Sequence, residues 1–297
     1  MDCAKPMNGI ATVSCAEPPE PYDRGKPLLE ILKKIVEKLV PPILLSVPAN
    51  LWRYHNWRVP PQLVQVAAEP GDLPPVKQDA FTSSAWLAHQ QPVPIEEPKI
   101  QLAHHIAVKT LCGLLNQPVQ VFDLGGGPAV LYPCARTATD DLDYIVLENA
   151  RICELGRKIF PKVRFFDTSA QALECLRPGG ISLCVSVLQY CLDWKSALGL
   201  LVASAPKFVV IGRHYTRDDG PVLYALQRIH GSHGYCGEAH MAIIPMASLI
   251  EEMRKLGYSL VSSMVSEDAT PIVAKSQRRQ IPSLSTQTAI FMAMTDH

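Results

Sequence analysis

A run of three glycines directly after an apolar segment is the clearest chemical signal in the sequence. Val119–Leu124 carries an acidic residue, Asp123, just before its end, and Gly125–Gly127 and Pro128 follow. Glycine lets the backbone approach a ligand closely and adopt positive φ, and Pro is favoured in the first turn of a helix. The N–H groups at the start of that helix then face the ligand. The segment therefore predicts a binding site where a strand passes into a helix.

Acidic residues also end the next two predicted strands. Glu148 follows Tyr144–Leu147 and lies 21 positions after Gly127, and Asp167 follows Val163–Phe166. A carboxylate at the end of the second strand can accept hydrogen bonds from both hydroxyls of a ribose. Three acids at successive strand ends, together with the glycine turn, favour a cofactor that contains a nucleoside.

The glycine turn does not match the common phosphate-binding motifs. A P-loop requires Lys after its last glycine, and no Lys follows Gly127. The dinucleotide motif G-x-G-x-x-G fails at its last position, which is Val130. A ligand with an adenosine but no phosphate needs no cationic loop, so the turn favours that kind of ligand.

The elements that must position these residues follow a βα alternation, which is typical of a doubly wound, mainly parallel α/β sheet. A polar insertion at Arg213–Met241 separates this part from a helix at Met246–Leu256. Two last strands, Tyr258–Val265 and Thr286–Ala293, are expected to form an antiparallel pair at one edge. The alternating part has predicted strands at Val119–Leu124, Tyr144–Leu147, Val163–Phe166, Ile181–Leu188 and Phe208–Ile211, and predicted helices at Ala129–Thr137, Asn149–Ile159, Ala170–Leu176 and Ser196–Ser204.

The first third of the chain has a different composition. Residues 1–98 hold sixteen of the 26 Pro but only three of the 17 Gly. We expect a flexible tail at 1–25, a Pro-rich helical cap at 26–98, and the ligand-binding domain at 99–297. Within the cap, the pattern predicts an amphipathic helix at Pro27–Val40 and a loop at 60–79, and a further helix follows at Lys99–Asn116. Four aromatic residues are expected to close the cap over the strand ends: Trp52, Tyr54, Trp57 and Trp86.

Charge and composition exclude several classes of partner. The 28 Lys and Arg balance 28 Asp and Glu, and no dense basic run occurs, so a nucleic-acid partner is not expected. No stretch approaches the roughly 20 apolar residues that span a bilayer. The nine Cys form no C-x-x-C pair, and the first 25 residues do not resemble a signal peptide, which favours a reduced, cytoplasmic protein. We expect a small-molecule substrate, and the composition leaves room for a homodimer.

The glycine segment resembles a known motif. Asp123-Leu124-Gly125-Gly126-Gly127-Pro128-Ala129 is similar to D-x-G-x-G-x-A/G, the first motif of class I S-adenosylmethionine-dependent methyltransferases. The resemblance implies a Rossmann-like seven-stranded fold, with S-adenosylmethionine as cosubstrate or substrate and no metal. It places Asp123, Gly125 and Gly127 beside the amino-acid part of the cofactor, Glu148 at the ribose, and Asp167 at the adenine amino group.

A narrower resemblance covers about Leu102 to Met264. Together with the glycine turn, Val187–Asp193 and the element around Arg213 resemble a methyltransferase-like family from bacterial biosynthetic clusters, which implies secondary metabolism. Leu124 and Pro128 depart from the F-G-G-G pattern of that family. The chain is also similar to azetidine-2-carboxylate synthases, which share the fold but cyclise S-adenosylmethionine itself.

The reacting sulfonium of the cofactor is expected next to the end of the fourth strand, where methyltransferases of this fold position it. This places Ser186 at the cofactor and makes Gln189 and Tyr190 candidate catalytic residues. The Tyr190 ring can make a cation–π contact worth ~0.5–2 kcal/mol, and Gln189 can hydrogen-bond an amine or a carboxylate. His214, after the fifth strand, is a candidate base at the pocket rim. The sequence has no N-P-P-Y motif, so transfer to a nucleobase or amide nitrogen by that arrangement is not supported.

Three functions follow from these features. Methyl transfer to a small molecule requires positioning of the acceptor and exclusion of water, and a base only where the acceptor must lose a proton. Cyclisation of S-adenosylmethionine gives azetidine-2-carboxylic acid and methylthioadenosine without an acceptor. A non-enzymatic interaction protein that binds S-adenosylmethionine gives no turnover.

The segment His230–His240 allows two interpretations. Its potential metal ligands are His230, His233, Cys236 and His240, but their spacing matches no standard zinc finger. The glycines between them are also typical of a lid over an active site, which would carry Tyr224, Tyr235 or His240 inward. We expect the lid and no metal.

Overall fold

The computed structural model describes residues 62–81, 84–90, 103–115, 118–229, 235–266, 272–273 and 284–294. Residues 57–297 form one compact unit, and residues 1–56 form another, which lies outside the described residues. The expected tail, the helix predicted at Pro27–Val40, and Trp52, Tyr54 and Trp57 fall outside them as well. The described part of the expected cap therefore belongs to the same unit as the expected ligand-binding domain.

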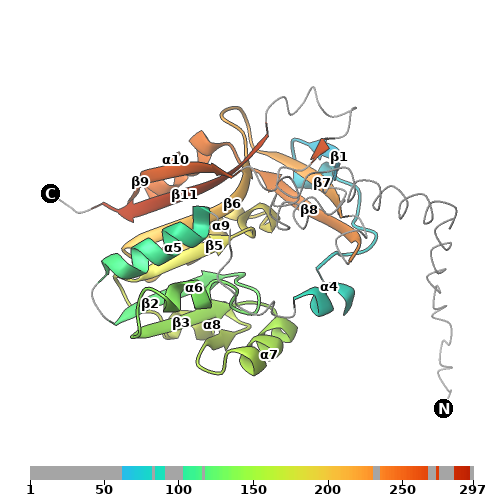
Figure 1. The fold of residues 1–297 in the computed structure, drawn as a ribbon. Coiled ribbons are helices and arrows are strands. Elements are labelled where there is room, and N and C mark those ends of the chain that lie inside the picture. The colour runs from blue at the N-terminus through green and yellow to red at the C-terminus, as the bar shows by residue number, and fades with distance from the viewer. Residues whose placement is uncertain are drawn as a thin grey trace, which may run out of the picture. The chain divides into compact units, whose positions relative to one another are not determined.

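A seven-stranded sheet forms the centre of this unit (Figure 1). Its strand order is β4-β3-β2-β5-β6-β11-β9, in which the first five strands are parallel and β11 is antiparallel to both of its neighbours. The strands are β2 (Val119–Leu124), β3 (Leu142–Leu147), β4 (Arg164–Phe166), β5 (Ile181–Val185), β6 (Phe208–Thr216), β9 (Tyr258–Ser266) and β11 (Ser285–Ala293). This is the Rossmann-like arrangement of class I methyltransferases, and it confirms the predicted fold.

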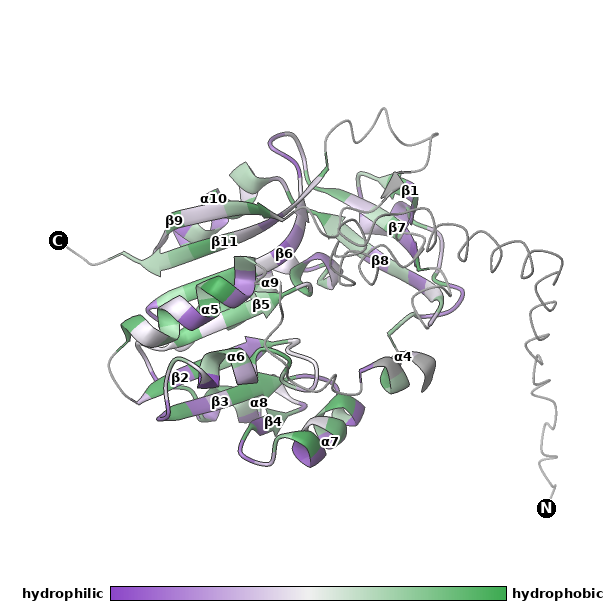
Figure 2. Cartoon of the chain, viewed as in Figure 1, coloured by the Kyte–Doolittle hydropathy of each residue, from purple (hydrophilic) through white to green (hydrophobic). Residues whose placement is uncertain are grey.

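Helices cover both faces of the sheet and bury one apolar core on each (Figure 2). Because successive strand residues point to opposite faces, Val121 enters one core and Phe122 the other. The first core receives α5 (Ala103–Leu114), α6 (Tyr132–Arg136) and α7 (Ala150–Ile159). The second receives α8 (Ser169–Glu174), α9 (Trp194–Val202) and α10 (Met246–Lys255).

Two of these helices begin at side-chain caps next to the carboxyl ends of the strands. The Asn149 side chain accepts a hydrogen bond from Ile152 N (3.1 Å) at the start of α7. The Asp193 carboxylate accepts one from Ser196 N (3.2 Å) at the start of α9. Such caps satisfy N–H groups that have no partner within the helix, and they fix the loops after β3 and β5.

A second sheet of four strands, in the order β10-β1-β7-β8, corrects the prediction of a polar insertion at 213–241. Its strands are β1 (Gln62–Ala67), β7 (Leu223–Ile229), β8 (Gly237–Ile243) and β10 (Ile272–Val273). β6 continues to Thr216, and β7 and β8 then form an antiparallel pair. The prediction was wrong because it overlooked the apolar side chains that this sheet buries, such as Ala225, Met241 and Ile243.

β1 also corrects the loop predicted at 60–79, and with it the purely helical description of that part of the cap. Gln62–Ala67 pairs antiparallel with β7, so that Gln62 lies opposite Arg228 and Ala67 opposite Tyr224. A strand whose partner lies about 160 residues away in the chain has no local signal beyond its own short pattern. The rest of the described part contains a 3₁₀ turn, Pro70–Asp72, and the helix α4 (Ser84–His89).

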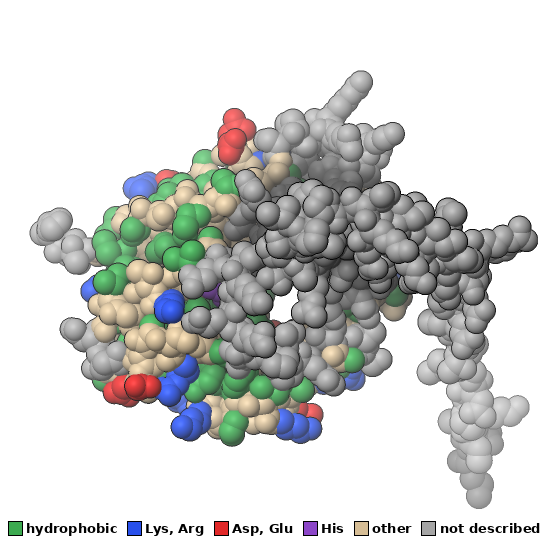
Figure 3. Space-filling view, viewed as in Figure 1, with side chains coloured by type: hydrophobic (Ala, Val, Ile, Leu, Met, Phe, Trp, Pro, Cys, Tyr) green, Lys and Arg blue, Asp and Glu red, His purple; other side chains and the backbone are tan. Residues whose placement is uncertain are grey.

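The remaining boundaries differ by a few residues from the predicted ones. The fourth predicted strand ends at Val185 rather than Leu188, and the 3₁₀ turn η2 (Leu188–Tyr190) follows. No helix in the described part of the chain is long and apolar enough to cross a membrane. On the face shown in Figure 3, basic side chains are interspersed with acidic and apolar ones.

Candidate active site at the carboxyl ends of the strands

Backbone hydrogen bonds hold the ends of β2, β3 and β4 side by side. Gly125 N donates to Leu147 O (2.9 Å), and Glu148 N donates to Phe166 O (3.0 Å). The glycine turn and Glu148 therefore occupy neighbouring positions on one edge, and Asp167 follows β4 on the same edge. The carboxylates also influence one another, since Glu148 contributes to a raised pKa of Asp123.

Asp123 lies under the glycine turn rather than in contact with solvent. Its side chain is 1% exposed, and Oδ2 accepts a hydrogen bond from the Tyr144 hydroxyl (2.6 Å). Oδ1 is buried without a partner. Burial raises the pKa of Asp123 to about 7, the Tyr144 hydrogen bond opposes this rise, and the charge of Glu148 adds to it. Asp123 is therefore poised to change charge near neutral pH.

Each of the three positions in the turn requires glycine for its own steric or conformational reason. Gly125 has φ +68, and a Cβ there would overlap the side chain of Val187 after β5. A Cβ at Gly126 would overlap the Asp123 carboxylate, and Gly127 has φ +57. Positive φ is energetically unfavourable for residues that have a Cβ. Glycine is therefore needed at these positions for the turn to pack over Asp123 and against Val187.

The other two predicted cofactor-binding acids are accessible. Glu148 is half-buried, and its Oε1 accepts hydrogen bonds from the backbone N and the side-chain Nδ2 of Asn149, each at 2.8 Å. Asp167 is exposed. Their roles in cofactor binding stay predictions.

The loop after β5 brings Ser186, Gln189 and Tyr190 to the same edge. Ser186 adopts φ +62, and its N donates to Gly212 O (2.8 Å) on β6. Gln189 is 2% exposed, whereas Tyr190 is half-buried and packs edge-to-face against Phe81 with a ring-centroid distance of 4.7 Å. Because Val187 touches the glycine turn, these residues lie beside the predicted cofactor site.

Tyr190 is oriented by the second sheet. Its hydroxyl donates to Gln227 Oε1 on β7 (2.8 Å), and its ring joins the apolar cluster of that sheet. Burial raises the pKa of Tyr190, so the hydroxyl stays protonated at neutral pH. Tyr190 is therefore not set up as a general base.

His214 lies in β6 and not in a loop at the pocket rim, because the strand continues to Thr216. The side chain is 1% exposed, and Nε2 lies 3.4 Å from Ile244 O. Burial lowers the pKa of His214 to about 4, which keeps the ring neutral at pH 7. Within the described residues, no hydrogen bond links it to Gln189 or Tyr190, and its catalytic role stays a prediction.

Sequence reasoning missed Gln227, Phe81 and Gln90. The Gln90 Oε1 atom lies 3.6 Å from the position that a Cβ on Gly127 would occupy. A signal existed for Gln227, which is a polar residue inside the apolar run Leu223–Ile229. Phe81 and Gln90 had no signal of their own, but they lie in the segment that was expected to close over the strand ends, and Phe81 packs edge-to-face against Trp86 with a ring-centroid distance of 5.7 Å.

The segment predicted as a lid or metal site is described in part. His230 and His233 lie outside the described residues, Cys236 is exposed, and His240 Nε2 lies 2.8 Å from Pro74 O. No group of three or more His, Cys, Asp or Glu suited to a metal ion occurs in the described ranges. Tyr235 is close enough to Tyr190 to raise its pKa.

No family model matches this chain, and no curated protein matches it. Among solved structures, it is similar to an S-adenosylmethionine-dependent methyltransferase from Clostridium acetobutylicum, with 11% identity, 66% of this chain and 92% of that chain covered, and a TM-score of 0.44. It is also similar to magnesium protoporphyrin IX methyltransferase from Synechocystis with bound S-adenosylmethionine (13%, 73% and 95% covered, TM-score 0.44). A third is the 1,6-didemethyltoxoflavin-N1-methyltransferase of Burkholderia thailandensis (15%, 65% and 79% covered, TM-score 0.41). The fold assignment itself rests on the strand order of the sheet.

Proposed function

We propose that this protein is an S-adenosylmethionine-dependent enzyme that transfers a methyl group to a small molecule. The observation that carries the proposal is the placement of Asp123 under the glycine turn with Glu148 beside it. The Glu148 carboxylate repels the phosphates of a nucleotide, and Asp123, whose pKa is about 7, adds to this repulsion in its ionised form. The two acidic side chains attract a ligand that carries an ammonium and a sulfonium group on an adenosine.

The residues present fit this cofactor. Val187 and Asp123 fill the space beside Gly125 and Gly126, whereas a Cβ on Gly127 would meet nothing closer than 3.6 Å, so the turn is least crowded at Gly127. Asp123 Oδ1 is buried without a partner, and Glu148 is half-buried and available for a ribose. Bound S-adenosylmethionine supplies an electrophilic methyl group on sulfur. In this proposal Glu148 orients the nucleoside, Asp123 holds the turn and its charge favours the cationic end, and Asp167 contacts the adenine.

The loop after β5 would hold the acceptor. Tyr190 and Gln189 lie beside the turn, and the raised pKa of Tyr190 leaves it a hydrogen-bonding and packing group rather than a base. Transfer then depends on alignment of the acceptor and on exclusion of water, which contribute without any proton transfer by the protein. An acceptor from secondary metabolism, as the sequence resemblance implies, is compatible with such a site.

A calorimetric binding experiment tests the cofactor assignment. We expect S-adenosylmethionine and S-adenosylhomocysteine to bind and NAD⁺ and ATP not to bind. Glu148→Gln should weaken binding by about 10- to 100-fold, because hydrogen bonds to a charged group contribute about 1.5–3 kcal/mol. Glu154→Gln changes an exposed residue of α7 and is the matched control. Equal affinities of the two variants would contradict the assignment.

Product analysis then distinguishes the reactions. The purified protein is incubated with S-adenosylmethionine, alone and with a panel of small acceptors, and the nucleoside product is identified by mass spectrometry. S-adenosylhomocysteine that appears only with an acceptor supports methyl transfer. Methylthioadenosine and azetidine-2-carboxylic acid formed without an acceptor would show that the protein catalyses cyclisation and not methyl transfer. Tight binding without any product would indicate an interaction protein.

A further inference from the structure

Two buried glutamines lie next to Tyr190, one from the 3₁₀ turn after β5 and one from the second sheet. Gln189 belongs to η2 and is 2% exposed, and Gln227 belongs to β7 and is 0% exposed. The Tyr190 hydroxyl donates to Gln227 Oε1 (2.8 Å), and Gln189 is also within hydrogen-bonding reach of Tyr190. We call Gln189 and Gln227 the amide pair.

Each member of the amide pair has a buried polar atom without a partner. These atoms are Oε1 of Gln189, an acceptor, and Nε2 of Gln227, a donor. Turning the Gln227 amide by 180° would place Nε2 against the Tyr190 hydroxyl and Oε1 at the position that now lacks a partner. Buried polar atoms are nearly always hydrogen-bonded in folded proteins. Two exceptions around one tyrosine therefore point to groups that a ligand supplies.

The amide pair lies at the edge where the acceptor must enter. Gln189 is two residues after Val187, which touches the glycine turn. The rings of Phe81 and Tyr190 are half-buried and pack edge-to-face, so aromatic surface reaches the outside next to the two amides. Aromatic rings at such distances favour a further flat ring in contact with them.

No charged group is among the main influences on the Tyr190 hydroxyl. Besides burial, the main influences on the pKa of its hydroxyl are the hydroxyls of Tyr215 and Tyr235 and hydrogen bonding with the amide pair. None of these groups carries a charge at neutral pH. An ion brought among them would lose its hydration without gaining an opposite charge, which is costly.

We infer that the amide pair selects an uncharged, planar acceptor that presents a hydrogen-bond donor and an acceptor side by side, such as a carboxamide, a lactam or a hydroxylated heteroaromatic ring. Gln227 is then a specificity-determining residue that the second sheet contributes, and Tyr190 positions it. The inference rests on the proposed function, because it concerns the acceptor side of the same site.

Three probes of one shape test this inference: benzamide, benzoate and benzamidinium. They share a planar ring and differ in charge and in their pattern of donors and acceptors. Their dissociation constants are measured by ligand-observed NMR, with and without saturating S-adenosylhomocysteine. We expect benzamide to bind at least about 10-fold more tightly than either ion, in line with the cost of leaving an ion unpaired. Equal or tighter binding of an ion would overturn the inference.

Variants assign the preference to the amide pair. Gln227→Met and Gln189→Met keep the approximate shape but remove the amides, and each should reduce the preference for benzamide to less than about 3-fold. Gln171→Met, on the exposed face of α8, is the matched control and should keep the full preference. Thermal unfolding shows whether each variant is folded, and a folded Gln227→Met and Gln189→Met that both keep the preference would overturn the inference. Failure of the proposed function appears separately, as absent binding of S-adenosylhomocysteine to the unmodified protein.

Discussion

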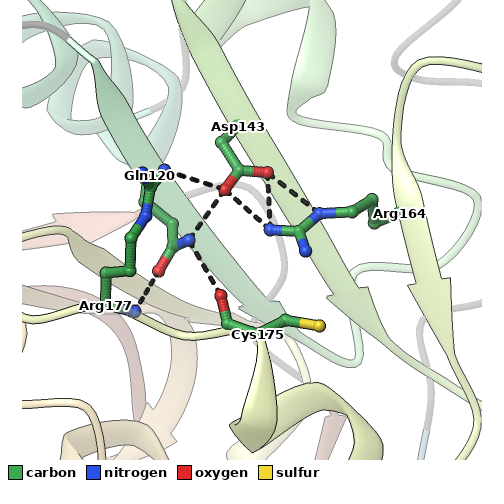
Figure 4. Close-up of polar contacts among 5 residues, drawn as sticks. All are labelled: Gln120, Asp143, Arg164, Cys175 and Arg177. Carbon is green, nitrogen blue, oxygen red and sulfur yellow. Dashed lines mark hydrogen bonds and ion pairs between the residues drawn. The ribbon is translucent and has the colours of Figure 1, made fainter.

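The two edges of the seven-stranded sheet use their polar residues in opposite ways. At the amino ends of the strands, Asp143 on β3 is bound by Arg164 (2.7 Å) and Arg177 (3.0 Å), and Gln120 on β2 joins them (Figure 4). Gln120 Nε2 donates to Asp143 Oδ2 (2.7 Å) and to Cys175 O (3.1 Å), and Oε1 accepts from Arg177 N. Both polar atoms of this buried amide are satisfied, and the network ties β2, β3 and β4 to the segment before β5.

At the carboxyl ends, several polar atoms are left unpaired and the backbone is strained, whereas the described part of the amino edge has one unpaired atom, Ser182 Oγ on β5, and one non-glycine residue with positive φ, Ala205 before β6. Asp123 Oδ1, Gln189 Oε1 and His214 Nδ1 are buried without partners. Residues that are not glycine also have positive φ here, among them Ser186 (62°), directly after β5, and Arg213 (49°), in the neighbouring strand β6. Unpaired atoms and strain cost stability, and they persist where binding or catalysis requires them.

From this comparison we infer that the amino edge stabilises the sheet while the carboxyl edge carries the candidate site. The amino-edge network stabilises the strand order, so the opposite edge can keep groups that are unfavourable in the free protein. Each of the following predictions tests one side of this division.

The largest expected effect is a pH dependence of stability that originates at Asp123. Its pKa is about 7 in the folded protein, against an ordinary value of 3.8, so the folded state holds a proton that the unfolded state loses in this window. The stabilising contribution is complete below about pH 4 and is lost as the pH rises through about 7. At about 1.4 kcal/mol per pH unit, the free energy of unfolding falls by roughly 4 kcal/mol in total.

Urea unfolding between pH 4 and 8 measures this effect as a difference between the unmodified protein and Asp123→Asn. Asparagine stays neutral and can still accept the Tyr144 hydrogen bond, so the difference in unfolding free energy should fall steadily over the range. Asp219→Asn, at an exposed position, should follow the unmodified protein at every pH. Parallel curves for Asp123→Asn and the unmodified protein would show that Asp123 is not the source.

The next effect concerns the glycine turn. Gly126→Ala places a methyl group against the Asp123 carboxylate, so the turn must move. A displacement of about 1 Å in a positioning element can cost on the order of 100-fold, and we expect a similar loss of S-adenosylmethionine affinity by calorimetry. Gly199→Ala is the control, because no heavy atom lies within 4 Å of its Cβ position in α9. It should bind normally and gain about 0.5–1 kcal/mol of stability.

The contrast between the edges also explains what the sequence could predict. The βα alternation gave β2 at its observed bounds and Met246–Lys255 within one residue, because both have strong local patterns. Glycines and acids at strand ends marked the carboxyl edge for the same reason. β1 was missed because its partner β7 lies about 160 residues away in the chain. β7 and β8 are neighbours in the chain, and their pairing was missed because the polar residues between the apolar ones hid the side chains that the second sheet buries.

In the candidate site, too, local patterns were predicted and tertiary contacts were missed. The sequence indicated that Asp123 and Tyr190 belong to it, but not that Asp123 lies beneath the turn or that Tyr190 is oriented by Gln227. His214 was expected at the rim because the end of β6 was placed too early. The spacing of residues locates strand ends, whereas the direction of a side chain depends on tertiary contacts that the spacing does not contain.

At the amino edge, Gln120→Met should destabilise the protein without affecting binding. The substitution leaves Cys175 O, Arg177 N and part of Asp143 without their hydrogen bonds. Unpaired buried groups cost about 1–3 kcal/mol each, and partial access to water reduces the sum to about 2–3 kcal/mol. Urea unfolding should show this loss while calorimetry shows an unchanged affinity for S-adenosylmethionine. A large change in affinity would mean that the two edges are coupled.

The smallest effect is the same substitution at the other edge, with the opposite sign. Gln189 is as deeply buried as Gln120, but its Oε1 has no partner. Methionine has a similar length and removes the unpaired polar atom, and the loss of the hydrogen bond to Tyr190 offsets only part of this gain, so Gln189→Met should gain up to about 1 kcal/mol in urea unfolding. The gain should come with a weaker preference for an uncharged acceptor. If Gln189→Met instead lost as much stability as Gln120→Met, the carboxyl edge would be as fully satisfied as the amino edge, and its unpaired amide would not be held for a ligand.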